Sequence, residues 1–431
     1  MHKRTTTMLG LLIIASFVLA SCGGPAATTE APAVVEPTDV PAEPDPEVVE
    51  EPVEEPVEEP AAIEDEWGLM TFEPGQTIKI AVSSALAGAY AVYGQDMLNG
   101  VDTAIADFGA LEGWEVVSEG GDDGCDGAAG VTVAEQFSAD PDVLAVVGPM
   151  CSGSVVPASD IYAEHNIVMI TPSSTAVIVT ARGYENLFRI VANDDLQAEV
   201  TTDFLLEDLG LTSLGLLHDQ SIYGEGIAMA VAEKFEAGGG TVTDIQGVTR
   251  GDTDYSAVVT SILAGDPEAI YWGGMDAEGA LLINQLRAAG FEGVYFGPDG
   301  IKSKPTYIDA SGGAAEGSYA TFGAVGGASG YDEWEAAFTE KYGAPVAYGP
   351  GSYDAATIIL NAAAEVAQVD ADGNLVIGRK ALADQIRATP HSGITGFLEF
   401  TDTGDLSKVS ITIFQVVDGD FVEVKKVDFG E

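Results

Sequence analysis

The sequence predicts an α/β protein made of two doubly wound lobes, each built on a parallel sheet. From Trp67 onward, short apolar strand patterns alternate with helical patterns, which is typical of βαβ units whose helices cover both faces of a sheet. The alternation comes in two successive series of similar size, the second starting after Asn193. The chain from Trp67 to Glu431 is also too long for one compact core, so two lobes are expected.

The first series predicts a regular succession of strands and helices. Its strand patterns lie at residues 78–82, 116–119, 144–148 and 168–170, and its helical patterns at 95–108, 131–137 and 155–164. The second series predicts strands at residues 214–218, 242–248, 269–272 and 294–296, and helices at 226–235, 255–263 and 281–289. Parallel strands of this kind are buried on both faces, which explains their continuous apolar runs.

The pattern changes after Phe322 to longer helices and a C-terminal set of strands. Helices are expected at residues 332–342, 353–367 and 380–387, and strands at 397–400, 409–417 and 421–427, with Asp418-Gly419 as a hairpin turn.

The N-terminus predicts a lipoprotein signal peptide over residues 1–21. A basic start is followed by an apolar stretch from Met8 to Ala20, too short to span a membrane comfortably. Leu19-Ala-Ser-Cys22 resembles the bacterial lipobox, so Cys22 is the expected site of lipidation and membrane anchoring. The alternative is ordinary cleavage near Ala20, which would leave a free thiol. No later segment is long and apolar enough to span a bilayer.

Residues 22–66 are expected to form an acidic tether rich in Pro and Glu. Fifteen acidic residues lie between Glu30 and Glu66, with no Lys or Arg, and such a stretch stays extended rather than burying a core. The formal net charge of −52 is therefore mostly carried by the folded part. This charge argues against nucleic acid as a partner, and a solvated acidic surface suited to salty surroundings is the simpler explanation.

Two cysteines, Cys125 and Cys151, remain if Cys22 is lipidated, and a disulfide is favoured in an oxidising compartment. A metal site is the alternative, because Asp122-Asp-Gly-Cys-Asp126 is rich in carboxylates. Its spacing fits no calcium loop. No metal site and no cofactor are predicted.

Serine and threonine follow two apolar strand patterns, which predicts an anion site. Ser152 stands in Gly148-Pro-Met-Cys-Ser-Gly153, between a strand and a helical pattern, and Thr171-Pro-Ser-Ser-Thr175 follows the next strand. Free N–H groups and hydroxyls at helix N-termini suit a carboxylate. The alternative is that both clusters only cap their helices.

In the second lobe, too, candidate binding residues are expected at the carboxyl ends of the strands. Tyr223, Met275 and Asp299 each follow a predicted strand, and ligands of parallel sheets gather at the carboxyl ends of strands. Facing edges of two lobes would make a cleft.

An ordered set of segments resembles the bacterial periplasmic leucine/isoleucine/valine-binding proteins, the type I solute-binding components of ABC importers. The densest pieces are Pro157-Ala-Ser-Asp-Ile-Tyr162, Met169-Ile-Thr-Pro172 and Thr180-Ala-Arg-Gly183, and further pieces include Tyr223-Gly-Glu-Gly226, Tyr271-Trp-Gly-Gly274 and Gly297-Pro-Asp-Gly300. The resemblance implies two lobes joined by a three-strand hinge, and a Cys125–Cys151 pair. Lobe 1 would comprise about residues 75–192 and 322–395, and lobe 2 about 193–321 and 396–431.

The resemblance also implies a ligand set. Ser152 and Thr175 match residues that bind an α-carboxylate. The carbonyl of Ser173, the hydroxyl of Thr175 and the acid Asp299 match groups that bind an α-ammonium. Tyr223 matches a tyrosine that reaches the ligand from lobe 2. Tyr93, Met150 and Tyr348 match residues lining the side-chain region.

Three departures alter this set. The acid is usually Glu where Asp299 stands, Met275 replaces a Tyr of the branched-chain binders, and Ser173 replaces an Ala. We therefore expect an amino acid ligand, branched-chain or otherwise apolar, with the side-chain specificity open.

The resemblance implies a monomeric, extracytoplasmic, lipid-anchored protein that delivers its ligand to ABC permease and ATPase subunits. Alternatives are a short amide, urea or aromatic acid as ligand, or a sensory role for the same scaffold. An enzyme is not expected. Only four histidines are present as possible general bases, and Cys151 cannot serve as a nucleophile if it forms the disulfide.

Overall fold

The computed structural model describes residues 62–323 and 328–430. The strands of the first sheet are β2 (Ile78–Ser84), β3 (Ala110–Leu111), β4 (Trp114–Asp122), β5 (Val143–Val147), β6 (Met169–Thr171) and β7 (Leu187–Arg189). They lie in the order β3-β4-β2-β5-β6-β7, and every pair except β3–β4 is parallel.

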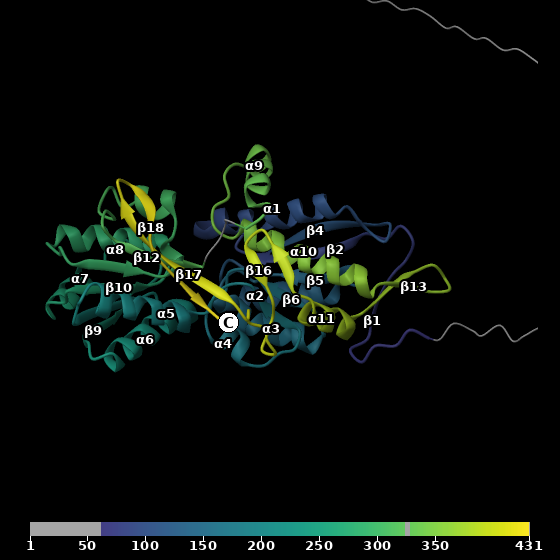
Figure 1. The fold of residues 1–431 in the computed structure, drawn as a ribbon, viewed down its shortest axis with the longest axis horizontal. Coiled ribbons are helices and arrows are strands. Elements are labelled where there is room, and N and C mark those ends of the chain that lie inside the picture. Colours follow the sequence, from purple (N-terminus) through teal and green to yellow (C-terminus); the bar gives the residue numbers. More distant parts are fainter. Residues whose placement is uncertain (1–61, 324–327, 431) are drawn as a thin grey trace, which may run out of the picture. The chain divides into compact units, whose positions relative to one another are not determined.

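Helices cover both faces of this first sheet (Figure 1). The helices of this lobe are α1 (Ala91–Phe108), α2 (Gly127–Ala139), α3 (Ser152–Glu164), α4 (Ile178–Ala181), α9 (Tyr331–Tyr342), α10 (Gly349–Val366) and α11 (Arg379–Ala388). Of these, α9 packs on α1 rather than on the sheet. A small sheet at one end joins β1 (Leu69–Phe72), β14 (Leu375–Gly378) and β13 (Gln368–Val369), and β15 (His391–Gly393) pairs with β16 (Gly396–Leu398).

The second sheet has seven strands and belongs to the second lobe. Its strands are β8 (Ser213–His218), β9 (Thr241–Gly247), β10 (Ala269–Gly273), β11 (Val294–Gly297), β12 (Tyr319–Gly323), β17 (Val409–Val417) and β18 (Asp420–Phe429), and its helices are α5 (Asp194–Asp203), α6 (Ile222–Ala237), α7 (Ser256–Leu263) and α8 (Asp276–Ala288). The order is β18-β17-β12-β11-β10-β8-β9. The last two C-terminal strands pair antiparallel, so the sheet is mixed rather than purely parallel.

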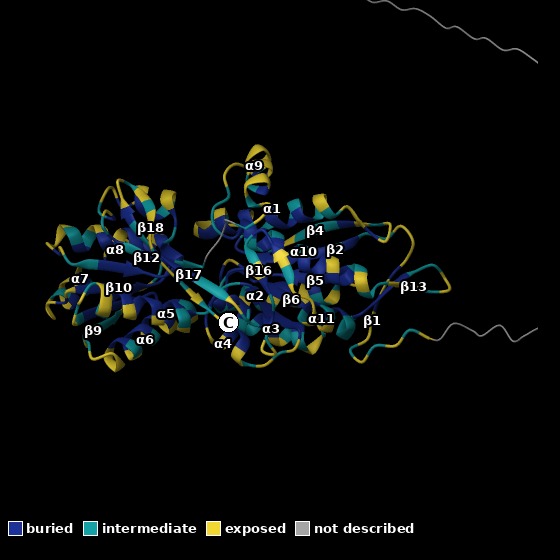
Figure 2. Ribbon diagram, viewed as in Figure 1, coloured by how far each residue is buried: buried dark blue, intermediate teal, exposed yellow. Residues whose placement is uncertain are grey.

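Alternate residues of β2 show how one strand serves two cores. Ile80 and Val82 pack in the cluster that contains α1 and α10, whereas Ala81 packs in the cluster that contains α2 and α3. Because side chains alternate across a strand, a strand covered on both faces must be apolar throughout. In Figure 2 the central strands β5 and β10 are dark blue, whereas the edge strands β9 and β18 are intermediate or exposed, as are the outer helices and loops.

The predicted fold class is confirmed, and side chains cap the N-termini of α2, α5 and α6. Asp126 caps α2 by accepting from the N–H groups of Ala128 and Ala129 at 2.9 and 3.0 Å. Ser221 caps α6 by accepting from Gly224 N–H at 2.9 Å. Such caps satisfy N–H groups that the helix itself leaves free.

The chain passes between the lobes at three places, after β7, after β12 and before β17. Leu398, Phe400 and Leu406 pack with the core of the first lobe. The second lobe, expected to resume at about residue 396, thus resumes at β17. The apolar side chains of this segment explain the difference, because they are buried against the core of the first lobe.

The start of the domain also lies slightly earlier than its strand pattern indicates. Asp65, within the expected tether, accepts from the N–H groups of Lys380 and Ala381, both at 3.0 Å, and so caps α11. The expected signal peptide and Cys22 lie outside the described residues. Among the helices of the described part, none is long and apolar enough to cross a membrane.

Candidate functional site

The first lobe presents the N-terminus of α3 beyond the carboxyl end of β5. Gly148 makes the turn with φ +111°, and a Cβ there would lie 2.2 Å from the carbonyl oxygen of Ser83, so a glycine is required. Ser152 is the first residue of α3 and is buried. The first turn of a helix leaves N–H groups without intrahelical partners, and the positive end of its dipole favours an anion.

The Ser152 hydroxyl does not cap its own helix. Its Oγ instead accepts a hydrogen bond from Ala176 N–H at 3.3 Å. This bond ties the start of α3 to the loop after β6, so the two Ser/Thr clusters that the sequence singled out lie side by side. The hydroxyl hydrogen stays available to an acceptor, such as a carboxylate oxygen.

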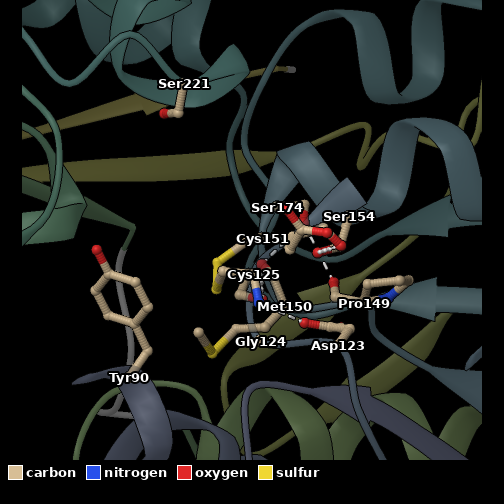
Figure 3. The surroundings of a disulfide bond; sticks show 12 residues. Tyr90, Asp123, Gly124, Cys125, Pro149, Met150, Cys151, Ser154, Ser174 and Ser221 are labelled. Atoms are coloured by element: carbon tan, nitrogen blue, oxygen red, sulfur yellow. Dashed lines mark hydrogen bonds between the residues drawn. A yellow bond between two sulfur atoms is a disulfide. The ribbon is translucent and has the colours of Figure 1, made fainter. Parts of the chain in front are cut away.

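Cys125 and Cys151 form a disulfide with a Cα–Cα distance of 5.2 Å, which confirms the predicted pair. Figure 3 shows the bond next to Met150, just before α3. Asp123 accepts from Cys125 N–H at 2.9 Å and from Ser83 Oγ at 2.9 Å. The disulfide therefore fixes the loop after β4 against the residue that precedes Ser152.

The loop of residues 172–176 is held by Arg189 rather than by a helix. The alternative, that its Ser/Thr cluster only caps a following helix, does not hold, because α4 starts only at Ile178 and has no side-chain cap. Arg189, fully buried, donates to the carbonyls of Thr175 and Ala176 at 2.9 and 2.8 Å. Its guanidinium also pairs with Asp405 at 2.6 Å.

Two polar groups of this loop face the site. Ser173 Oγ donates to the carbonyl of Met150 at 2.8 Å, and Ser173 lines the cavity next to Ser152. Thr175 Oγ1 is buried and makes no hydrogen bond to any residue that the structure describes. A buried hydroxyl without a partner is costly, so a ligand that supplies one is favoured.

Asp299 brings a buried carboxylate from the second lobe. It lies two residues after the end of β11 and is 8 % exposed. Its Oδ1 accepts from Tyr223 OH at 2.8 Å and from Gln197 Nε2 at 2.9 Å. Tyr223 sits in the first turn of α6, and its hydroxyl also accepts from Gly300 N–H at 2.9 Å.

The electrostatics of Asp299 favour a cationic partner. Burial raises the pKa of this carboxyl above its usual range, because a charge removed from water is destabilised. Among the described residues no Lys, Arg or His forms an ion pair with it. An ammonium group placed beside Asp299 would supply the missing counter-charge.

Aromatic and sulfur-containing side chains line the rest of the region. Tyr348 and Tyr93 have ring centroids 5.7 Å apart, and Met275, at the N-terminus of α8, packs with the core of the first lobe. Asp96 positions Tyr348, since its carboxylate accepts from the N–H groups of residues 346–349 at 2.6 to 3.0 Å.

Side chains of the two lobes contact each other directly beside the site. Tyr93 OH in α1 donates to the Asp276 carboxylate in α8. Arg250 donates to Tyr90 OH at 2.8 Å, lies over the same ring at 5.1 Å, and faces Asp219 at 3.6 Å. These contacts hold the lobes together in this conformation, which is therefore a closed one.

Two cavities adjoin Asp299. The smaller, about 40 Å³, is lined by residues of both lobes, among them Met150, Ser152, Ser173, Tyr223, Met275, Asp299 and Tyr348. The larger, about 340 Å³, lies on the side of the three interlobe passages and is lined among others by Ser173, Thr175, Gln197, Asp299 and Tyr348. The smaller cavity has room for only a few water molecules.

A family model described as periplasmic binding protein matches residues 77–420. The chain belongs to this family. The match spans both lobes and ends in the last C-terminal strand, so it includes every residue of the site described above.

Individual relatives agree with the family match. A Leu/Ile/Val-binding protein homolog of Brucella melitensis is 34% identical over 350 residues, which is 80% of this chain and 93% of the relative. A leucine-, isoleucine-, valine-, threonine- and alanine-binding protein of Pseudomonas aeruginosa is 32% identical over 79% of this chain and 90% of its own length. The crystal structure of a leucine-binding protein from Thermotoga maritima superposes with a TM-score of 0.74 at 26% identity, covering 81% of this chain and 98% of that one.

The structure brings most of the predicted site residues to one place. All of the nine candidates line the smaller cavity except Thr175, which lines the larger one, and Tyr93, whose hydroxyl bonds Asp276 across the cleft. Sequence reasoning missed Asp96, Arg189, Gln197 and Arg250. Their roles depend on partners 100 or more residues away in most cases, which no local pattern reveals. Only Gln197 had a local signal, because Asn193 caps the N-terminus of α5 and so indicates that a helix begins just before Gln197.

Loss of the disulfide should lower stability measurably. Closing a loop of 26 residues stabilises by about 3.5 kcal/mol in the chain-entropy model. We expect the variant with Cys125→Ala and Cys151→Ala to unfold at correspondingly lower urea concentration than the oxidised protein. Equal midpoints, or two free thiols in the oxidatively secreted protein, would contradict this.

Proposed function

We propose that this protein captures a small apolar α-amino acid outside the cytoplasm by closing its two lobes, and passes it to an ABC importer. The single observation that carries the proposal is the pairing of opposite electrostatics across one cavity. The N-terminus of α3, with Ser152, lies on one side, and the buried carboxylate of Asp299 lies on the other.

This arrangement complements a zwitterion. The carboxylate would accept from the N–H groups and hydroxyl at the start of α3 and from Thr175. The ammonium would donate to Asp299 and to the carbonyl of Ser173. Each charge of the ligand then has a partner, which is the condition for taking it out of water.

Because Asp299 and Tyr223 belong to the second lobe, the ligand's contacts are complete only when the lobes close. A ligand with extra affinity for the closed form shifts the population towards it. Micromolar affinity needs about 8 kcal/mol, which shielded charge-assisted bonds and a buried aliphatic side chain can supply.

The names of the relatives support a branched-chain or similar ligand, since they are described as binding leucine, isoleucine and valine. Met275, Met150 and the two tyrosines would contact an aliphatic side chain. Anchoring through Cys22, delivery to permease and ATPase subunits, and a monomeric state complete the proposal.

A panel of leucine and its truncated analogues tests the two charge contacts separately. We expect thermal unfolding to shift upward with leucine, isoleucine or valine, because a ligand that binds only the folded state stabilises it. 4-Methylpentanoate lacks the ammonium and 3-methylbutylamine lacks the carboxylate, and neither should shift the transition. Stabilisation by urea, acetamide or benzoate, with none by any amino acid, would contradict the proposal.

A further inference from the structure

A second buried carboxyl, Asp194, lies behind Asp299. It is the first residue of α5 and is 2 % exposed. Its backbone N–H donates to the carbonyl of Thr175 at 2.9 Å, which places it directly behind the loop of the proposed ligand site. Its Oδ2 is buried without a hydrogen bond of ordinary geometry among the described residues. Burial raises the pKa of this carboxyl, and the nearby Thr175 hydroxyl partly offsets the rise.

Gln197 joins the two carboxyls. Its Nε2 donates to Asp194 Oδ1 at 3.2 Å and to Asp299 Oδ1 at 2.9 Å. Its Oε1 accepts from Asp299 N–H at 3.3 Å and from Thr321 Oγ1 at 2.8 Å. Because the backbone N–H of Asp299 donates to Oε1 of Gln197, the Nε2 end of this side-chain amide must face the two carboxyls. Asp194 and Asp299 therefore share one NH₂ group as their donor.

Few cationic groups face this pair. Arg189 is the nearby guanidinium, and its donors are engaged by Asp405, Thr180 Oγ1 and the carbonyls of the 174–176 loop. The other titratable groups facing the pair are the hydroxyls of Tyr223 in α6, Tyr271 in β10 and Tyr348 before α10. Tyrosine hydroxyls are neutral at physiological pH.

The two acids cannot both carry full charge cheaply in this surrounding. Burial, and next the negative charge of Asp299, raise the pKa of Asp194 to about 8. Burial also raises the pKa of Asp299. Near neutral pH the empty site therefore holds a proton on Asp194, as expected for like charges that share a buried site.

We propose that Asp194 is a positioning residue of the ammonium site, protonated while the cleft is empty and ionised once a ligand ammonium lies beside Asp299. The proposal rests on the function proposed above. In this step the O–H bond of Asp194 breaks and its proton passes to water, while the ligand ammonium stays intact. The positive charge of the ligand beside Asp299 is then balanced by two carboxylates joined by Gln197 instead of one.

This predicts a proton release linked to binding. A ligand that lowers the pKa of Asp194 binds more tightly as pH rises towards the value of the empty site, about 8, and affinity then levels off. Within this window affinity should rise by up to about tenfold per pH unit for one proton.

Calorimetric titration of L-leucine in phosphate and in Tris at pH 7 measures the release directly. The proton that binding releases is taken up by the buffer, so the measured heat depends on the ionisation enthalpy of the buffer. We expect the difference between the two heats to correspond to the release of most of one proton per ligand bound. In Asp194→Asn, which keeps the shape and the acceptor for Gln197, the release and the pH dependence should both vanish.

The neighbouring Asp195 offers a matched control. It is the next residue of α5 but is exposed and pairs with Lys234 at 3.0 Å, so Asp195→Asn should keep the proton release of the natural protein. Equal heats in the two buffers for the natural protein, or an unaltered release in Asp194→Asn, would overturn this inference. If Asp194→Asn does not fold, the natural protein's heats still decide. Failure of every amino acid to bind would instead reject the proposed function.

Discussion

Replacing Asp299 by alanine should weaken amino acid binding by about 100-fold or more while the protein stays folded. The ligand ammonium would lose its buried counter-charge, and leaving one charge of a buried pair unmatched costs about 3–5 kcal/mol. The fold should tolerate the change, because burial raises the pKa of Asp299. A carboxyl with a raised pKa destabilises the folded protein above that pKa, so its removal relieves this penalty.

Calorimetry of the variant with leucine, together with its melting curve, measures both effects. Asp299→Asn separates charge from shape, because the amide keeps an acceptor for Tyr223, and it should bind nearly as weakly as the alanine variant. Glu292→Ala removes an exposed acid just before β11 and should leave binding unaltered. Undiminished affinity in Asp299→Ala would remove this residue from the site.

Replacing Arg189 by methionine should destabilise the protein by about 3 kcal/mol and weaken ligand binding as well. The side chain is fully buried and holds the carbonyls of Thr175 and Ala176 as well as the Asp405 carboxylate. Methionine keeps much of the volume but leaves these acceptors without donors, which is among the costlier changes in a core. Partial exposure of Asp405 limits the cost, since water can reach this carboxylate.

Urea unfolding measures the stability, and Arg182→Met is the matched control. Arg182 pairs with Asp160 at 2.6 Å, but the Asp160 side chain is about half exposed, and such pairs contribute less than about 1 kcal/mol. Equal midpoint shifts for the two variants would show that the buried network around Arg189 has no special role. Unchanged ligand affinity in a folded Arg189→Met protein would show that the loop keeps its shape without this side chain.

The fold was predictable from the sequence wherever a strand is buried on both faces. Val143–Val147 is apolar throughout and lies in the middle of the first sheet. Strands with weaker patterns were not predicted. Leu187–Arg189 ends in a charged residue, which is stabilised in the interior by the 174–176 carbonyls, Thr180 and the distant Asp405 rather than by its neighbours in the strand. The antiparallel C-terminal strands were expected. Their pairing with β12 was not, because it arises where the chain returns from the first lobe to the second, and no local sequence pattern indicates this.

The candidate site was predictable where function follows from local position, at the end of a strand or the start of a helix. Ser152 and Asp299 are of this kind, since Ser152 starts the helix that follows β5 and Asp299 lies two residues after the end of β11. The groups that orient them were not predictable. Asp96 fixes Tyr348 from 252 residues away, and Gln197 reaches Asp299 across 102. A hydrogen bond between segments so far apart leaves no periodicity in the chain.

A crystal structure of the protein with leucine bound tests most directly whether a zwitterion is held between the lobes. The account predicts the carboxylate within hydrogen-bonding distance of Ser152 and Thr175, and the ammonium within hydrogen-bonding distance of Asp299 and the Ser173 carbonyl. A ligand bound in the opposite direction, or bound away from Asp299, would contradict it.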